Sequence, residues 1–181
     1  TDSLKRLKTD YIDLYQVHWP DEQCRFEDTA ETMLKLQQEG KVRAIGVSNY
    51  SSDQMERFGS VCPITTNQPP YNLFERGVEG TTFGYTEKNN IVTLAYGALC
   101  RGLLSGRMKA DTKFGNDDLR SFDPKFVEPR FKQYLNAVSQ LNAFASQHFQ
   151  KDILALAVRW LLDRGNTVAL WGARRPSQLD A

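Results

Sequence analysis

The stretch Tyr11-Ile-Asp-Leu-Tyr-Gln-Val-His-Trp-Pro-Asp21 joins a short strand-like segment to a polar and aromatic cluster that follows it directly. Four further segments repeat this arrangement: Val42–Val47 before Ser48-Asn49, Ile64–Thr66 before Asn67-Gln68, Ile91–Ala95 before Tyr96-Gly97, and Thr167–Leu170 before Gly172-Ala-Arg-Arg175. In an open doubly wound sheet only the strands beside the topological switch point need to carry ligand groups, whereas in a (β/α) barrel every strand can do so at one rim. The recurrence therefore predicts a barrel.

Helical patterns separate these strands. They are Glu27–Gln38 with Gly40 as a stop, a helix after the capping residues Ser51-Ser52-Asp53, Arg130–Gln147, and Asp152–Asp163 capped by Asp152. In Arg130–Gln147 the spacing places one apolar stripe on Phe131, Leu135, Val138, Leu141 and Phe144. Strands alternating with helices predict an α/β fold with a parallel sheet and right-handed crossovers. Only five strands can be counted, whereas a closed (β/α)8 TIM barrel needs eight and typically about 250 residues. We therefore expect residues 1–181 to form a single domain that covers about strands 4 to 8 of such a barrel and is incomplete at both ends.

Composition narrows the class of protein. The chain is 40% hydrophobic and 25% charged, the balance of a soluble globular protein, and its formal net charge of +1 argues against nucleic acid or an anionic membrane as partner. Apolar runs fall short of the roughly 20 residues of a membrane span, so we expect a cytoplasmic protein. Cys24, Cys62 and Cys100 are widely spaced, which argues against a zinc site and predicts no bound metal.

A long segment, Gly97–Pro129, breaks the alternation of strands and helices. It is rich in Gly and Asp and has no clear periodicity. Loops of this length in a compact domain are usually functional or disordered. We expect this one to fold over a ligand.

Five segments carry a resemblance to a known family. They are Asp10–Asp21, Arg43-Ala-Ile-Gly-Val-Ser-Asn-Tyr50, Asn67-Gln-Pro-Pro-Tyr-Asn72, Ala95–Gly106 and Trp171-Gly-Ala-Arg-Arg175. Through these segments the chain resembles the aldo-keto reductase family, in its bacterial-type and potassium-channel beta-subunit-like branch. The resemblance implies a (β/α)8 barrel that uses NADPH/NADP+ as cofactor and reduces small aldehydes and ketones to alcohols by hydride transfer. It also implies a cofactor extended across the C-terminal rim without a Rossmann fold, and the sequence has no G-x-G-x-x-G motif.

The resemblance gives His18 a catalytic role. Its ring N–H would point at the substrate carbonyl oxygen and stabilise the alkoxide that develops there. Taken without the His-Trp-Pro-Asp context, a lone histidine at a strand end is more simply a hydrogen-bonded rim residue. Trp19 is the candidate substrate contact.

The resemblance assigns the nicotinamide to the ends of three strands. Ser48, Asn49 and Gln68 would hold its carboxamide, since hydroxyl and amide groups can donate and accept together. Tyr96 would stack its ring on the nicotinamide and leave one face toward the substrate. The alternatives are that Ser48 and Asn49 are polar strand-end or helix-capping residues, and that Tyr96 belongs to the core.

The remaining cofactor contacts are assigned in two groups. Leu99, Arg101, Leu103 and Ser105 would contact the pyrophosphate and ribose as the long loop closes. Gly172, Arg174, Arg175 and Gln178 complete the cofactor set, the last three at the adenosine 2′-phosphate, because guanidinium groups suit a phosphate at a helix N-terminus. The alternative for the second group is a solvated basic turn.

The sequence departs from the family at the proton donor. The family uses a tyrosine whose pKa is lowered by a lysine paired with an aspartate, and residues 1–181 offer no position that matches any of the three. Two alternatives to the reductase therefore stay open: an NADPH-binding regulatory module of the potassium-channel beta-subunit type, and an inactive fragment.

Overall fold

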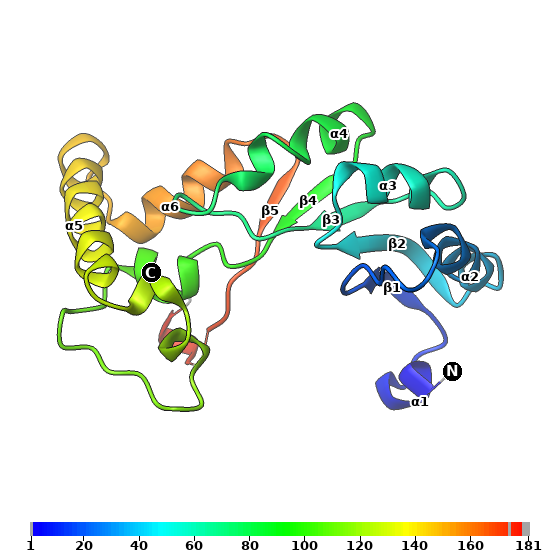
Figure 1. Cartoon of the computed structure of the whole chain (residues 1–181), viewed down its shortest axis with the longest axis horizontal. Coiled ribbons are helices and arrows are strands. Elements are labelled where there is room, and N and C mark those ends of the chain that lie inside the picture. Colours follow the sequence, from blue (N-terminus) through cyan, green and yellow to red (C-terminus); the bar gives the residue numbers. More distant parts are fainter. Residues whose placement is uncertain (1, 174, 179–181) are drawn as a thin grey trace.

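A parallel sheet organises the computed structural model, which describes residues 2–173 and 175–178 (Figure 1). Its strands are β1 (Ile12–Val17), β2 (Val42–Ser48), β3 (Thr66–Gln68), β4 (Val92–Ala95) and β5 (Thr167–Ala169). Each strand pairs in parallel with the next one along the chain, in the order β1-β2-β3-β4-β5. A doubly wound sheet reverses its strand order at a switch point, and this sheet does not. The predicted α/β fold with a parallel sheet is confirmed.

Six α-helices accompany the sheet in the described part of the chain. They are α1 (Asp2–Leu7), α2 (Phe26–Gln38), α3 (Ser52–Gly59), α4 (Phe83–Lys88), α5 (Arg130–Phe149) and α6 (Ile153–Leu162). Two of the predicted caps are confirmed. Ser51 forms a capping box with Gln54, and the Asp152 carboxylate accepts a hydrogen bond from the Ala155 N–H at 2.9 Å. Figure 1 shows α3, α4 and α6 along one side of the sheet, while the segment after β5 lies on the other side.

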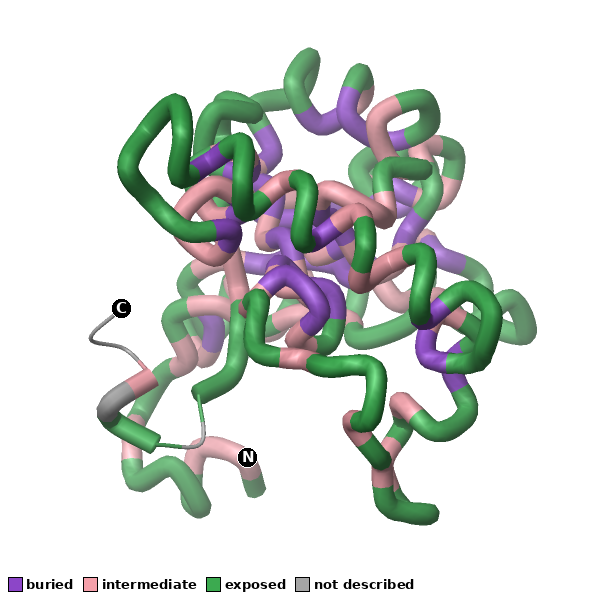
Figure 2. The backbone as a smooth tube through the Cα atoms, turned by 90° about the vertical axis from the view of Figure 1, so that its left-hand side faces the viewer, coloured by how far each residue is buried: buried purple, intermediate pink, exposed green. Residues whose placement is uncertain are grey.

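The main core lies between the sheet and its helices. Ile45 and Val47 of β2 are fully buried and pack with Met33 of α2 and with Met55 and Phe58 of α3. In the tube view of Figure 2, the buried residues gather in the middle of the molecule, and the outer turns of the helices and loops are exposed. Because side chains alternate along a strand, Ala44, Gly46 and Ser48 of β2 lie on the opposite face of the sheet, away from these helices. The candidate site lies at the carboxyl ends of the strands and includes Ser48.

Two local predictions were wrong, and one helix was not predicted. Strand β3 begins at Thr66 and not at Ile64, because its parallel ladder with β2 runs from the Gly46 and Thr66 pair to the Ser48 and Gln68 pair. Helix α4 was not foreseen, since its short sequence contains a glycine and little periodicity. Phe144 of α5 was placed on the apolar stripe of that helix, but it is 46% exposed, and Ala145 is buried instead.

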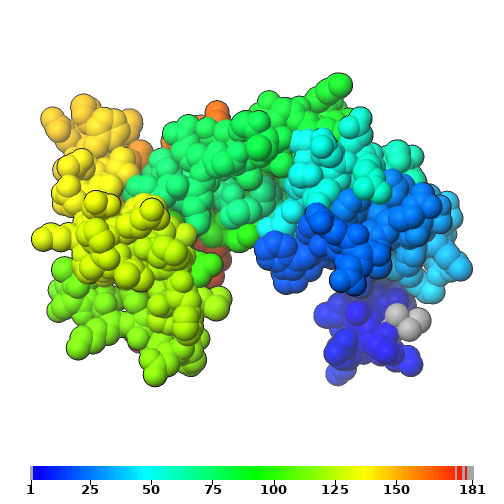
Figure 3. All heavy atoms as spheres, viewed as in Figure 1, coloured from blue at the N-terminus to red at the C-terminus, as the bar shows by residue number. Residues whose placement is uncertain are grey.

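The segment 97–129 is built from short turns. It contains the 3-10 helices η2 (Cys100–Ser105), η3 (Leu119–Ser121) and η4 (Pro124–Phe126). Leu103, Leu104 and Phe126 pack with α5 and α6 in a second buried cluster. In Figure 3 this segment and α5 form a lobe at one end of the molecule, and a hollow separates its lower part from the N-terminal part of the chain.

Candidate cofactor and active site

Asn49 lies at the centre of a polar cluster at the carboxyl ends of β1, β2 and β4. Its backbone is left-handed, with a φ of 62°, a conformation that asparagine tolerates better than most residues. The side-chain Nδ2 donates hydrogen bonds to the His18 carbonyl oxygen at 3.1 Å and to Ser48 Oγ at 3.0 Å. The Tyr96 hydroxyl donates to Asn49 Oδ1 at 3.0 Å. Asn49 therefore links the carboxyl ends of β1, β2 and β4 by hydrogen bonds.

Gln68 joins the same cluster through its backbone. Its carbonyl oxygen accepts a hydrogen bond from Ser48 Oγ at 2.7 Å and another from the Asn49 N–H at 3.1 Å. The half-buried side-chain amide of Gln68 makes no hydrogen bond to the part of the protein that the structure describes. Ser48 Oγ and Asn49 Nδ2 already donate their protons to acceptors within the cluster. The Gln68 side chain, in contrast, has both its NH₂ donor group and its carbonyl acceptor available for a ligand.

Tyr96 is fixed by its main chain as well as by its hydroxyl. Its N–H donates to the Pro69 carbonyl oxygen at 3.0 Å, so β3 and β4 stay in register beyond their last ladder pairs. Burial, assisted by the negative charge of Glu75, raises the pKa of the Tyr96 hydroxyl. The hydroxyl therefore stays protonated and can remain a hydrogen-bond donor to Asn49 at neutral pH.

His18 and Trp19 lie on the exposed side of this cluster. The carbonyl oxygen of His18 is held by Asn49, while its ring is exposed, with its centroid 6.1 Å from that of Trp19. Trp19 is 59% exposed, although a large apolar ring is usually more buried than this. Two side chains able to contact a small molecule therefore stand beside the polar cluster.

The four residues predicted at the start of the long segment have different environments. Leu103 is fully buried, Leu99 packs at the edge of the same apolar cluster, and Ser105 Oγ donates to the Gly102 carbonyl oxygen at 2.6 Å. Arg101 is exposed. Cys100, Arg101 and Gly102 all have positive φ, an uncommon run that turns the chain sharply at the arginine. Of the four, Arg101 is the one whose side chain is exposed.

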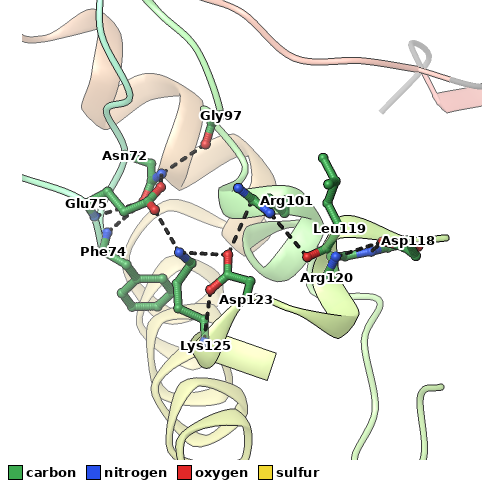
Figure 4. Close-up of polar contacts among 10 residues, drawn as sticks. All are labelled: Asn72, Phe74, Glu75, Gly97, Arg101, Asp118, Leu119, Arg120, Asp123 and Lys125. Atoms are coloured by element: carbon green, nitrogen blue, oxygen red, sulfur yellow. Dashed lines mark hydrogen bonds and ion pairs between the residues drawn. The ribbon is translucent and has the colours of Figure 1, made fainter. Parts of the chain in front are cut away.

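A network of polar side chains that the sequence did not reveal connects Arg101 to the loop after β3 (Figure 4). Arg101 Nε is 3.4 Å from Asp123 Oδ2, Lys125 Nζ is 2.9 Å from that same oxygen, and Lys125 Nζ is also 2.8 Å from Glu75 Oε1. Asn72, which is fully buried, donates from Nδ2 to Glu75 Oε2 at 2.6 Å and to the Gly97 carbonyl oxygen at 3.0 Å. Glu75 and Lys125 are 50 positions apart in sequence, so neither local spacing nor periodicity could have indicated their contact.

Of the predicted phosphate-binding residues near the C-terminus, Arg175 and Gln178 form a tight turn. Gly172 is exposed, and the backbone N–H of Arg175 donates to Gln178 Oε1 at 3.0 Å at the start of η5 (Pro176–Gln178). A short 3-10 helix therefore begins where the sequence predicted a helix start. Arg174 lies outside the described residues.

Two cavities lie away from these strand ends. One of about 150 Å³ is lined by residues of α4 and by residues beside the N-terminal ends of β4 and β5, including Thr86, Thr93 and Arg164. The other is an open depression at the junction of α5 and α6. Residues 2–173 and 175–178 contain no cluster of three His, Cys, Asp or Glu side chains arranged to hold a metal ion. In the same residues, no helix has the length and apolar character needed to span a membrane.

Comparisons with known proteins identify the family of the chain. The model of the aldo/keto reductase family matches residues 1–181. This chain belongs to the aldo/keto reductase family. It is 58% identical over 180 residues to the aldo-keto reductase YhdN of Bacillus subtilis, covering 99% of this chain and 54% of that protein. The chain thus spans about half the length of the curated relatives it matches.

Solved structures agree with the family assignment. A glycerol dehydrogenase from Gluconobacter oxydans is similar with a TM-score of 0.93 and 53% identity, over 98% of this chain and 54% of that one. An aldo/keto reductase from Klebsiella pneumoniae, solved in complex with NADP and acetate, has a TM-score of 0.70 and 25% identity, over 99% of this chain and 54% of that one. The likeness extends over nearly all of this chain's fold.

Proposed function

We propose that this chain forms about strands 4 to 8 of a (β/α)8 barrel in an NADPH-dependent oxidoreductase that reduces aldehydes or ketones to alcohols. The observation that carries the proposal is the cluster of Ser48, Asn49, Gln68 and Tyr96, which gathers hydroxyl and amide groups at the carboxyl ends of adjacent parallel strands. Ligands of parallel α/β sheets bind at those ends. The sequential strand order and the quoted motifs support the barrel and its bacterial-type, potassium-channel beta-subunit-like branch.

The cluster fits a nicotinamide carboxamide. That group has an NH₂ donor and a carbonyl acceptor, and the Gln68 amide offers the reverse pair at one position. Asn49 Oδ1 and Ser48 Oγ each keep acceptor capacity beyond the contacts described above. Bound there, the cofactor supplies a hydride. Tyr96, held by Asn49 and Pro69, would place its ring against the nicotinamide and block one face of it.

His18 is the candidate catalytic residue of this chain. Its exposed ring stands beside the cluster, and a ring N–H directed at a carbonyl oxygen stabilises negative charge that develops there. Trp19 forms an apolar wall next to it. The resemblance gives proton delivery to a tyrosine that has no matching position in residues 1–181.

The preference for NADPH is assigned to Arg174, Arg175 and Gln178, at the adenosine 2′-phosphate. Guanidinium groups match phosphate oxygens in charge and geometry, and the Klebsiella pneumoniae relative was solved with NADP. An Escherichia coli relative that is 30% identical over 181 residues is named an NADH-specific methylglyoxal reductase, so the family includes both preferences. The two cofactors are therefore compared directly in the test.

The test measures cofactor binding and turnover in the full-length protein. We expect tighter binding of NADPH than of NADH by fluorescence titration, and oxidation of NADPH that depends on an added aldehyde such as glyceraldehyde, whose reduction yields the glycerol named in one relative. Tyr96→Phe removes the hydrogen bond to Asn49 and should raise the Kd for NADPH by about fivefold, the worth of one such bond. Tyr134→Phe, on α5, is the control.

The outcomes separate the candidate functions. Binding without aldehyde-dependent oxidation would favour the NADPH-binding regulatory module. Absence of binding in the wild-type protein would refute the proposal. An unchanged Kd for Tyr96→Phe would exclude the strand-end cluster as the nicotinamide site.

A further inference from the structure

The network in Figure 4 connects three loops that meet beside the proposed cofactor site. Glu75 and Asn72 follow β3, Gly97 and Arg101 follow β4, and Asp123 and Lys125 lie near the end of the long segment. Lys125 links the end of the long segment to the loop after β3. Its ammonium group contacts Asp123 in its own segment and Glu75 in that loop. The bond from Asn72 to the Gly97 carbonyl oxygen joins the second loop to the first.

Lys125 and Asp123 form the shielded part of this network. Their side chains are 17% and 7% exposed, so solvent screens their attraction less than it screens an ordinary surface pair. Burial alone would raise the pKa of the Asp123 carboxyl, but hydrogen bonds from the backbone N–H and the ammonium group of Lys125 hold that pKa below its usual value. Burial alone would likewise lower the pKa of Lys125, but its bonds to Glu75 and Asp123 raise it. Both groups are charged at neutral pH.

Arg101 is held more loosely than Lys125. Its guanidinium is 3.4 Å from Asp123 and 3.5 Å from the Leu119 carbonyl oxygen, both at the long end of polar contacts, and its side chain is 47% exposed. If Arg101 turned toward a phosphate, Asp123 would keep Lys125 as a counter-ion. The desolvated carboxylate would therefore not be left unpaired, which would otherwise be the main cost of that movement.

We propose that Lys125 is a positioning residue: it fastens the segment 97–129 to the loop after β3 and leaves Arg101 free to bind the diphosphate of the cofactor. The part that concerns the diphosphate rests on the function proposed above. The fastening itself rests only on the contacts of Lys125 with Glu75 and Asp123. The two parts are therefore tested by different measurements.

Hydrogen exchange in the full-length protein without cofactor tests the fastening. Lys125→Met and Glu75→Gln should each speed exchange of the amides between Arg101 and Phe122 by roughly tenfold, because each removes one end of the same partly buried link. The double variant should be little faster than either single one. Lys113→Met, an exposed lysine of the same segment, is the control.

The amides of α2 serve as an internal reference for global unfolding, because α2 packs in a different cluster. Faster exchange confined to the long segment supports the fastening. Exchange equal to that of Lys113→Met, or an equal acceleration in α2, overturns it, since Lys125 would then have no effect or only a general one on stability.

Titration with NADP+ tests the role in cofactor binding. Lys125→Met should raise the Kd for NADP+ by roughly tenfold through the loss of pre-organisation, and Lys113→Met should leave it unchanged. An unchanged Kd in Lys125→Met would refute the link to Arg101. Failure of the wild-type protein to bind NADP+ would refute the proposed function and that link together, while the exchange result would still decide the fastening.

Discussion

Gly46 of β2 is the glycine at which an added methyl group should destabilise the fold most. A Cβ built on Gly46 would lie 2.1 Å from Thr66 Oγ1, 2.9 Å from Gln16 Cγ and 3.1 Å from the Thr66 carbonyl oxygen. An ordinary contact begins at 3.4 Å, so Thr66 Oγ1 would have to move by about 1.3 Å (3.4 minus 2.1). Thr66 Oγ1 is also fixed by its hydrogen bond to Gln16 Oε1 at 2.9 Å.

We therefore predict that Gly46→Ala lowers the free energy of unfolding by about 1 to 3 kcal/mol, the usual range for overpacking a well-filled site. The gain in backbone entropy from replacing glycine, about 0.5 to 1 kcal/mol, offsets only part of this. Thr66 pairs with Gly46 across the sheet, and Ser48 lies two residues further along β2. A displaced Thr66 should therefore also disturb the candidate site.

Urea denaturation of the full-length protein, followed by circular dichroism, measures the effect. Gly84→Ala in α4 is the matched control: its added Cβ meets nothing within 4 Å, and we expect it to stabilise the protein by about 0.5 to 1 kcal/mol. The double variant Gly46→Ala with Thr66→Ala should recover part of the loss, since it removes the closest atom. A change below about 0.5 kcal/mol for Gly46→Ala, the range of neutral substitutions, would refute the packing argument.

Two further predictions concern stability outside the site. Hydrogen bonds from Arg76 and Tyr71 hold the pKa of Glu79 at about 2, below its ordinary 4.5, so Glu79 should contribute about 1 kcal/mol above pH 4.5 and lose that contribution as the pH falls toward 2. Melting temperatures from pH 7 to pH 3 should show the gap between wild type and Glu79→Gln closing on acidification, and a constant gap would contradict the assignment. Asp152→Ala removes the N-cap of α6 and should cost about 1 kcal/mol in urea denaturation. Asp163→Ala, at the other end of the same helix, should change stability by less than about 0.5 kcal/mol, and equal losses for both would argue against capping.

The sequence alone predicted the elements whose signals are local. Hydrophobic patterning predicted strand β1, and the same kind of pattern together with the capping aspartate Asp152 predicted helix α6. Both signals act over only a few residues. The polar residues at the carboxyl ends of β2 and β3 could also be placed together, since parallel strands bring their carboxyl ends to one edge. Their roles toward a cofactor came from the resemblance and stay a prediction.

Other features depended on contacts between distant parts of the chain. The start of β3 was misplaced because its ladder with β2, and not its own composition, sets its register. Phe144 was misplaced because helical periodicity gives a stripe but not the extent of the surface that covers it.

The network around Lys125 was decided by tertiary structure alone. Nothing near Lys125 in the sequence distinguishes it from other lysines, and its partner Glu75 comes from a loop 50 positions earlier. The sequence contained both charges but not the folding of the long segment that brings them within 2.8 Å. Local propensities act within a few residues, whereas the energy of an ion pair depends on distance and burial, which are defined only once the chain is folded.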